Sequence, residues 1–317
     1  MRSQQRRVIV LGAATSAGTH HAGQERAPEA LRAGGLVQRL TAAGLAVTDL
    51  GDVVHETFRV DRSGAGARNL DAVVRAAAAV ADAVERSAAE DALLVVLGGD
   101  CTITLGVLAG LQRAEPDTGL VYFDGDADLG TPGQGTGILD AMGIAHLLGL
   151  TETRLTGLFA GRPPITPARL AVLGYDEGDP ETWSPEMFAA MPGLTHFPDH
   201  AVRADPAGCA DAALSAVAAA ARLIVHFDVD AVDSGDLPLA NFPHYNTGVP
   251  LASAREILTT LFAAPRLAAV VLTEVNPSYD PGGDSLARYI EAVTGALITG
   301  LTAAAAPPGQ AGNESGG

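Results

Sequence analysis

Short apolar runs alternate with longer amphipathic stretches along most of the chain. Runs rich in Val, Leu and Ile predict buried strands at residues 8–12, 45–50, 92–97, 170–173, 223–230 and 267–274, and at the start of 120–132. Helices are predicted from Pro28 to the glycines at 34 and 35, from Thr102 or Thr104 to 111, and at 70–89, 138–148, 210–221, 253–262 and 285–301. This alternation predicts an α/β fold of three layers, a mostly parallel sheet flanked by helices on both faces.

Two segments lack such a pattern. Residues 180–206 are rich in proline and are expected to be irregular, with at most one or two helical turns, and 231–250 are expected to form a long loop. The chain has 317 residues, a length that allows two domains, yet no linker interrupts the alternation. We therefore expect a single domain at residues 1–302, followed by a disordered tail at 303–317 that offers little to bury.

Composition excludes several classes of function. The net charge of −17 argues against binding to nucleic acids or anionic membranes. All twenty basic residues are arginines, which excludes Schiff-base catalysis, pyridoxal-phosphate anchoring and a Walker-type phosphate loop, because each requires lysine. The two cysteines provide no disulfide framework, and no apolar run predicts a signal peptide or a membrane span. A cytoplasmic protein is expected.

The stretch 120–132, LVYFDGDADLGTP, carries the first candidate chemistry. Its apolar start leads into Asp124, Asp126 and Asp128, which alternate and in an extended segment would all point to one side. Carboxylates held so close together require a cation such as a hard divalent metal ion. A solvated acidic loop is the alternative, whereas an EF-hand loop is excluded because Leu129 and Gly135 stand where that loop needs glycine and glutamate.

A second stretch, 223–230 or LIVHFDVD, again ends an apolar strand with alternating carboxylates, Asp228 and Asp230. Polar residues also follow the runs at 94–97 and 269–272. The carboxyl ends of parallel strands are where open α/β sheets place their ligands. We therefore favour a metal site at this edge over two unrelated solvated loops.

Four blocks of the chain resemble the signature blocks of the arginase/agmatinase/formiminoglutamase family, the ureohydrolases, in order and spacing. They are GGDCT (98–102), FDGDADLGTP (123–132), HFDVDAVD (226–233) and TEVNP (273–277), and the opening GAATSAGTHHAGQERAPEALRAGGL is also similar. The resemblance implies an arginase-like fold holding two divalent metal ions, Mn²⁺ in the family, whose bridging hydroxide attacks a guanidinium carbon. It also implies a homo-oligomer, a trimer or a hexamer.

The resemblance also implies a role for individual residues. The metal ligands by position are Cys101, Asp124, Asp126, Asp128, Asp228 and Asp230. Asp128 would also hydrogen-bond the hydroxide, Glu274 would pair with the guanidinium group, and Asp140 stands where the family has a proton-transferring histidine. Candidate substrate contacts, besides Glu274, are His20, His21, Asp176, Asp179 and His244.

The chain departs from the family at several of these positions. Cys101 and Asp126 replace histidines, and Gly130 replaces an asparagine that recognises the substrate, which makes arginine itself a doubtful substrate. Five carboxylates and one thiolate would face four positive charges, an excess that predicts a less acidic metal-bound water and alkaline activity. A thiolate at Cys101 would also favour Fe²⁺, Co²⁺ or Zn²⁺ over Mn²⁺.

Cys101 and His226 each allow a second interpretation. The alternative for Cys101 is a buried thiol that packs as a small hydrophobic group, although its place directly after Gly-Gly-Asp favours ligation. His226 lies two residues before Asp228 on the same strand face, where contact with the site is one alternative, and a packed strand histidine is the favoured interpretation.

The sequence thus predicts a metal-dependent hydrolase that cleaves a C–N bond of a small cationic guanidino compound, or of a hydroxyguanidino or formimino compound. The alternative is a catalytically inactive protein of the same fold, acting as a metal-binding or regulatory subunit. The altered ligands motivate this alternative, and the retention of the aspartates and Glu274 argues against it.

Overall fold

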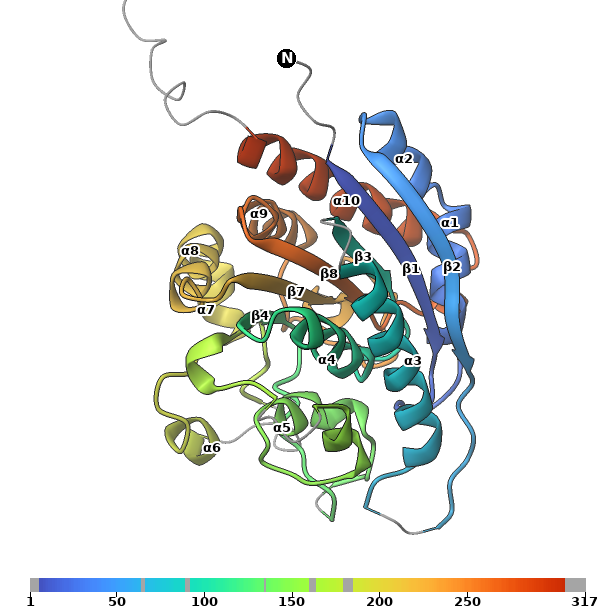
Figure 1. Cartoon of the computed structure of the whole chain (residues 1–317), viewed down its shortest axis with the longest axis vertical. Coiled ribbons are helices and arrows are strands. Elements are labelled where there is room, and N and C mark those ends of the chain that lie inside the picture. Colours follow the sequence, from blue (N-terminus) through green and yellow to red (C-terminus); the bar gives the residue numbers. More distant parts are fainter. Residues whose placement is uncertain are drawn as a thin grey trace, which may run out of the picture.

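Eight strands form one sheet in the computed structural model, which describes residues 6–63, 66–88, 92–133, 135–159, 164–178 and 185–305 (Figure 1). The strands are β1 (Arg7–Thr15), β2 (Ala46–Glu56), β3 (Leu93–Leu97), β4 (Thr118–Phe123), β5 (Leu170–Leu173), β6 (Thr195–Phe197), β7 (Arg222–Asp228) and β8 (Leu267–Thr273). Their order is β2-β1-β3-β8-β7-β4-β5-β6, and every neighbouring pair is parallel. The sheet is therefore entirely parallel, where the sequence predicted a mostly parallel one.

Helices cover both faces of this sheet. They are α1 (Ala27–Ala33), α2 (Leu36–Ala42), α3 (Leu70–Ala88), α4 (Ile103–Ala114), α5 (Gly143–Leu147), α6 (Pro185–Ala189), α7 (Asp199–Ala204), α8 (Pro206–Ala216), α9 (Leu251–Phe262) and α10 (Asp284–Ala305). Residues of α1, α2, α8, α9 and α10 pack against one face, and those of α3, α4 and α5 pack against the other (Figure 1). The predicted three-layer α/β architecture is confirmed.

Alternation along each buried strand builds the two core layers. Val8 and Val10 face the layer that contains α1 and α10, whereas Ile9 and Leu11 face α3 and α4. Because both faces are buried, both sets must be apolar, and the strands read as continuous runs of Val, Ile and Leu. No helix among the described residues is long and apolar enough to cross a bilayer.

The region 180–206 is where the prediction of irregular structure was wrong. Within its described part lie α6, the short strand β6 and α7, and α8 begins at Pro206. Three half-buried residues at the edge of the sheet are too few to show a periodic pattern, which explains why β6 was missed. The predicted start of the next helix at 210 was also late: Asp205 caps α8 by accepting a hydrogen bond from Gly208 N, and Pro206 occupies the first turn.

One further helix and three boundaries also differ from the predictions. Residues 36–42 form α2, which was not predicted, and β2 continues to Glu56. The helix predicted at 138–148 is a 3₁₀ turn at Asp140–Met142 followed by the short α5. The last helix extends to Ala305, so residues 303–305 of the predicted tail are helical, and 306–317 lie outside the described residues.

Candidate metal centre

The four central strands β3, β8, β7 and β4 carry the candidate site at their carboxyl ends. Cys101 follows β3, Asp124 follows β4, Asp228 ends β7, and Glu274 follows β8. These strands are neighbours and run in parallel, so their ends meet at one edge of the sheet. All four side chains belong to residues that are at most 4% exposed.

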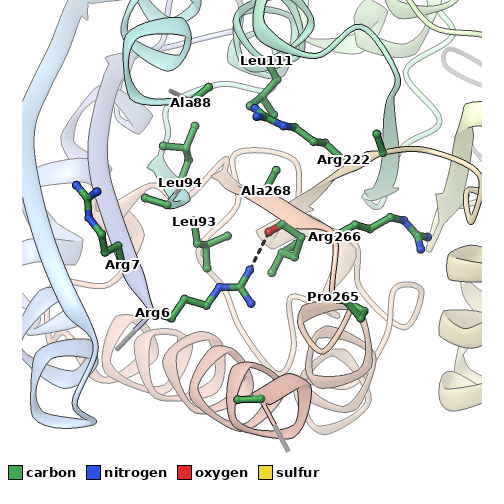
Figure 2. A pocket seen from close by; sticks show the side chains of 14 residues that line it. Arg6, Arg7, Ala88, Leu93, Leu94, Leu111, Arg222, Pro265, Arg266 and Ala268 are labelled. Atoms are coloured by element: carbon green, nitrogen blue, oxygen red, sulfur yellow. Dashed lines mark hydrogen bonds between the residues drawn. The ribbon is translucent and has the colours of Figure 1, made fainter. Parts of the chain in front are cut away.

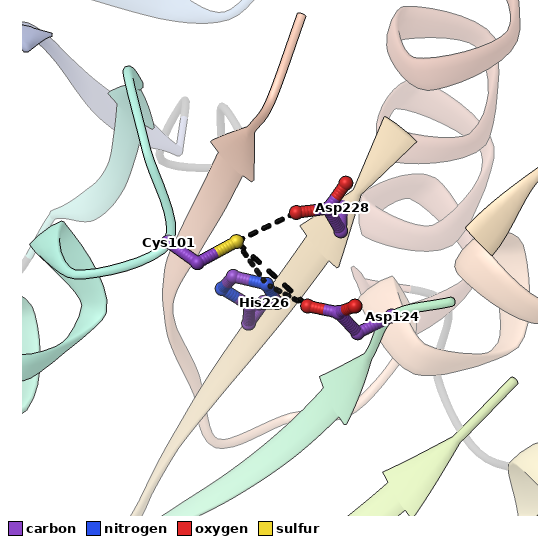
Figure 3. A group of neighbouring side chains, drawn as sticks. All are labelled: Cys101, Asp124, His226 and Asp228. Carbon is purple, nitrogen blue, oxygen red and sulfur yellow. Dashed lines mark hydrogen bonds and ion pairs between the residues drawn. The ribbon is translucent and has the colours of Figure 1, made fainter. Parts of the chain in front are cut away.

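Cys101, Asp124, His226 and Asp228 form what we call the inner group. Each offers a donor atom, and the four atoms lie within 4.8 Å of one another (Figure 3). Cys101 Sγ is 2.6 Å from Asp228 Oδ2, 3.7 Å from Asp124 Oδ2 and 3.6 Å from His226 Nε2. Sulfur, imidazole nitrogen and carboxylate oxygen together form a donor set that suits a borderline divalent cation.

Asp126, Asp230 and His244 form the outer group, which lies closer to solvent. Their donor atoms also lie within 4.8 Å of one another, with His244 Nε2 3.6 Å from Asp126 Oδ1. Burial by itself would lower the pKa of His244, but Asp126 and the charges of Asp230 and Asp176 raise that pKa to about 9. In the metal-free protein His244 is therefore positively charged and partly offsets the negative charges of Asp126 and Asp230.

Asp140 and Glu274 form an acid pair beside Cys101. Donor atoms of all three residues lie within 4.8 Å, and Cys101 N donates a 2.7 Å hydrogen bond to Asp140 Oδ1. Gln24 Nε2 donates a 2.6 Å hydrogen bond to Glu274 Oε2. Burial and the charge of Asp100 raise the pKa of Asp140 to about 8, and burial followed by the charge of Asp140 raises the pKa of Glu274 well above its usual range.

The expectation that Asp124, Asp126 and Asp128 point to one side was wrong. Strand β4 ends at Phe123, so the three residues are not extended, and Asp128 has a left-handed backbone with φ of +48°. Asp124 lies in the inner group and Asp126 in the outer group. Asp128 belongs to neither group, and its Oδ2 accepts a 2.5 Å hydrogen bond from the hydroxyl of Tyr122.

The electrostatics of this edge favour a bound cation. Burial, and then the charge of Asp230, raises the pKa values of Asp124 and Asp228 well above their usual range. Buried carboxylates that repel each other in this way are stabilised in the ionised form by a positive charge placed between them. The backbone at Glu274 is also left-handed, with φ of +63°, and strained residues of this kind cluster at functional sites. The residues present therefore fit a divalent metal ion.

The candidate substrate contacts lie on loops at the same edge. His20 packs on Phe242 with ring centroids 4.4 Å apart, and His21 lies edge-on to Tyr279. Asp176 Oδ2 is 3.8 Å from His244 Nδ1. Asp179 lies outside the described residues.

Sequence reasoning ranked one member of the site, His226, too low and missed another, Gln24. His226 does pack in the strand, stacked on Tyr122, but it also contacts the inner group. Its alternation with Asp228 on β7 was the available signal, since residues two apart on a strand share a face. Gln24, which hydrogen-bonds Glu274 across 250 residues, carried no signal beyond its place in the opening loop.

The opposite edge of the sheet holds a cavity of about 560 Å³ near the amino ends of the strands. Arg6, Arg7, Arg222 and Arg266 are among the residues that line it. Arg6 Nη2 donates to Leu267 O, and the guanidinium groups of Arg6, Arg7 and Arg266 lie apart and point in different directions (Figure 2). This cavity does not gather its charged groups around one point, in contrast to the carboxyl edge.

Comparison with known proteins agrees with this fold. The model of the arginase family matches residues 6–299. An arginase from Bacillus subtilis is 25% identical over 296 residues, which cover 91% of this chain and 97% of that protein. The crystal structure of the arginase from Bacillus caldovelox, 23% identical, superimposes with a TM-score of 0.81 over 94% of this chain and 99% of that one.

A proclavaminate amidino hydrolase from Streptomyces clavuligerus shares the fold at 18% identity, with a TM-score of 0.72 over 96% of this chain and 94% of that one. The match of the family model spans nearly the whole described fold and all of the site residues above. The chain belongs to the arginase family.

Proposed function

We propose that this protein is a metal-dependent hydrolase that cleaves a C–N bond of a guanidino, hydroxyguanidino or formimino compound. The observation that carries the proposal is the convergence of the inner group, the outer group and Glu274 at the carboxyl ends of four adjacent strands. Membership of the arginase family gives the reaction class.

The residues proposed to hold the metal ions include the carboxylates Asp124, Asp126, Asp228 and Asp230 together with Cys101, with Asp128 assigned by the resemblance. Divalent metal bound there would supply the positive charge that activates a water molecule for attack on the guanidinium carbon. The remaining steps fall to side chains of the chain itself.

Glu274 is suited to bind and orient the cationic end of the substrate. It is 3% exposed, its Oε2 is held by Gln24, and its Oε1 has no hydrogen-bond partner among the described residues. A carboxylate matches the planar fork of N–H donors on a guanidinium group. Gln24 would keep Glu274 in place while the free oxygen accepts from the substrate.

Asp140 is suited to supply a proton to the leaving amine. Burial and the charge of Asp100 raise the pKa of Asp140 to about 8, which favours the protonated form that a general acid needs. Its hydrogen bond from Cys101 N fixes the side chain at the edge of the inner group. This role replaces that of the histidine implied by the resemblance.

Arginine itself is not the proposed substrate, because the backbone leaves no room for the asparagine that Gly130 replaces. A Cβ atom on residue 130 would lie 2.6 Å from the carbonyl oxygen of Ala141, and Gly130 N donates to that same oxygen. The loop is therefore closed against residue 141, and the end of the substrate away from the guanidinium group must be read by other side chains.

The proposal is tested by measuring urea, ammonia or formamide release from a panel of guanidino, hydroxyguanidino and formimino compounds. The full chain is loaded with Mn²⁺, Zn²⁺ or Co²⁺, and its metal content is determined beforehand. Product release by the wild type, its loss in Asp228→Asn and its retention in the exposed control Asp82→Asn would support hydrolysis. Stoichiometric metal without turnover of any compound would instead favour the inactive alternative.

A further inference from the structure

We propose that His226 is a metal ligand and that it completes a closed, four-donor site for a borderline cation with Cys101, Asp124 and Asp228. The inference rests on the metal dependence proposed above. It concerns a histidine to which the family resemblance assigns no role. With His226 as a ligand, the metal centre consists of a buried inner site and a more open outer site, which differ in their donor atoms.

The position of His226 is fixed on three sides. The residue is fully buried on β7, and its ring lies flat on that of Tyr122, with centroids 3.9 Å apart and planes 5° from parallel. Its Nδ1 is 2.7 Å from the hydroxyl oxygen of Thr104. When Nδ1 carries the proton and donates to Thr104, the lone pair of Nε2 points at the inner group, an arrangement common for metal-binding histidines.

The hydrogen-bond partners of Nε2 are more distant than those of an ordinary buried nitrogen. The nearest polar atoms are Asp124 Oδ2 at 3.3 Å, Thr273 Oγ1 at 3.3 Å and Cys101 Sγ at 3.6 Å. Normal hydrogen bonds from nitrogen to oxygen are about 2.7–3.2 Å long. His146 is also fully buried, but its two nitrogens lie 2.8 Å and 2.9 Å from Met142 O and Thr153 Oγ1. Polar atoms therefore surround His226 Nε2 at longer distances than those between the nitrogens of His146 and their partners.

Three of four separations between donor atoms in the inner group match a tetrahedral site. Ligands at about 2.0–2.3 Å from a tetrahedral Zn²⁺ stand about 3.3–3.8 Å from one another. The distances from Cys101 to Asp124 (3.7 Å), from Cys101 to His226 (3.6 Å) and from His226 to Asp124 (3.3 Å) all lie in this range. The contact from Cys101 Sγ to Asp228 Oδ2, at 2.6 Å, is shorter, so Asp228 would move outward when the thiol loses its proton.

The donor types indicate which cations the inner site would prefer. One sulfur, one imidazole nitrogen and two carboxylate oxygens select Zn²⁺, Co²⁺ or Fe²⁺ over Mn²⁺. All four residues are at most 4% exposed. Four protein ligands would leave no open coordination position on a tetrahedral ion. The ion in the inner site would therefore be held tightly, and the outer group, in which Asp126 and His244 reach solvent, would bind the more exchangeable ion.

The test is a metal titration of the full chain after removal of metals by a chelator, with Zn²⁺ and Mn²⁺ followed by calorimetry. Loss of a residue that merely supports a ligand costs about 10–100-fold in affinity, so His226→Gln should weaken the tightest Zn²⁺ site by at least about 100-fold. His146→Gln, which removes another buried histidine, should keep the wild-type affinity. Wild-type affinity in His226→Gln would overturn the proposal.

A second measurement detects coordination by spectroscopy, and its cobalt part needs only the wild type. Co²⁺ should give the intense visible bands of a four-coordinate ion together with a thiolate charge-transfer band. In protein labelled with ¹⁵N-histidine, Zn²⁺ should shift the Nε2 signal of the histidine whose signals disappear in His226→Gln. An unchanged His226 signal at saturating Zn²⁺ would refute ligation.

The two proposals can fail separately. If Asp228→Asn loses Zn²⁺ while His226→Gln retains it, the role of His226 is refuted and the metal-dependent function stands. If the wild type binds none of these cations, both proposals fail.

Discussion

Replacing Glu274 with glutamine tests directly whether this buried carboxylate is the partner of a cationic substrate. The change keeps the shape of the side chain and an acceptor for Gln24 Nε2, which lies 2.6 Å from Oε2. It removes the negative charge of the carboxylate, whose Oε1 has no hydrogen-bond partner among the described residues. A hydrogen bond to a charged group contributes about 1.5–3 kcal/mol. A guanidinium ligand should therefore bind about 12- to 140-fold more weakly, at 1.4 kcal/mol per tenfold change.

The assay is calorimetric titration of metal-loaded wild type and Glu274→Gln with guanidinium and with urea, its neutral analogue. Urea affinity and metal content should not change. Glu256→Gln, a change to an exposed glutamate on α9, is the control and should bind both ligands as the wild type does. Equal losses for guanidinium and urea would show that the charge of Glu274 is not what the cation recognises.

The pH dependence of guanidinium binding gives a second check on the same residue. Burial, followed by the charge of Asp140, raises the pKa of Glu274, so the side chain must lose a proton before it can pair with a cation. Binding to the wild type should therefore strengthen as the pH rises. The glutamine side chain cannot ionise, so guanidinium binding to Glu274→Gln should not depend on pH. A pH dependence that persists in the variant would show that another group titrates.

Three other perturbations test separate parts of the structure. Tyr122→Phe removes the hydroxyl that donates to Asp128 in the core and should lower the free energy of unfolding by about 1–3 kcal/mol in urea titrations; no loss would show that the hydrogen bond is weak. Gly130→Asn should reduce stability and not create arginase activity, because its Cβ would meet Ala141 O at 2.6 Å; arginine turnover in this variant would contradict the closed loop. Because the native pKa of Asp140 is raised from 3.8 to about 8, the native state binds more protons than the unfolded state between these pH values, so the metal-free protein should lose about 1–5 kcal/mol of stability as the pH rises from 4 to 8. Urea unfolding of the metal-free protein at pH 4 and pH 8 measures this loss, and equal stability at both pH values would show that Asp140 does not titrate in this range.

The sheet could be predicted because its strands are buried on both faces. Such strands read as largely apolar runs, and a polar residue ends β7 and β8 and follows β3 and β4 within three residues. The edge strand β6 and the short helices around it bury less surface and depend on tertiary contacts, which no local pattern reports. This difference explains why the site edge was predicted and the region from 185 to 206 was not.

Within the site, the sequence pattern predicted which residues lie near one another, but not their separation into an inner and an outer group. Alternation in Asp124, Asp126 and Asp128 suggested one row of ligands because an extended backbone was assumed. The chain leaves the strand after Phe123, so the three carboxylates face different partners. Backbone conformation beyond a strand end is set by packing, here by Tyr122 and by Gly125, where a Cβ would lie 2.8 Å from the ring of His244.

The histidines change the charge balance that the sequence suggested. Six anionic ligands around two divalent ions would leave an excess of two negative charges. If His226 and His244 bind as neutral ligands while Asp128 stays with Tyr122, the anionic ligands are Cys101, Asp124, Asp126, Asp228 and Asp230. The excess then falls to one negative charge, which a singly charged guanidinium substrate would neutralise. On this basis the shift of activity toward alkaline pH should be smaller than six anionic ligands would produce, and Tyr122→Phe, which releases Asp128 to the centre, should move the pH profile upward.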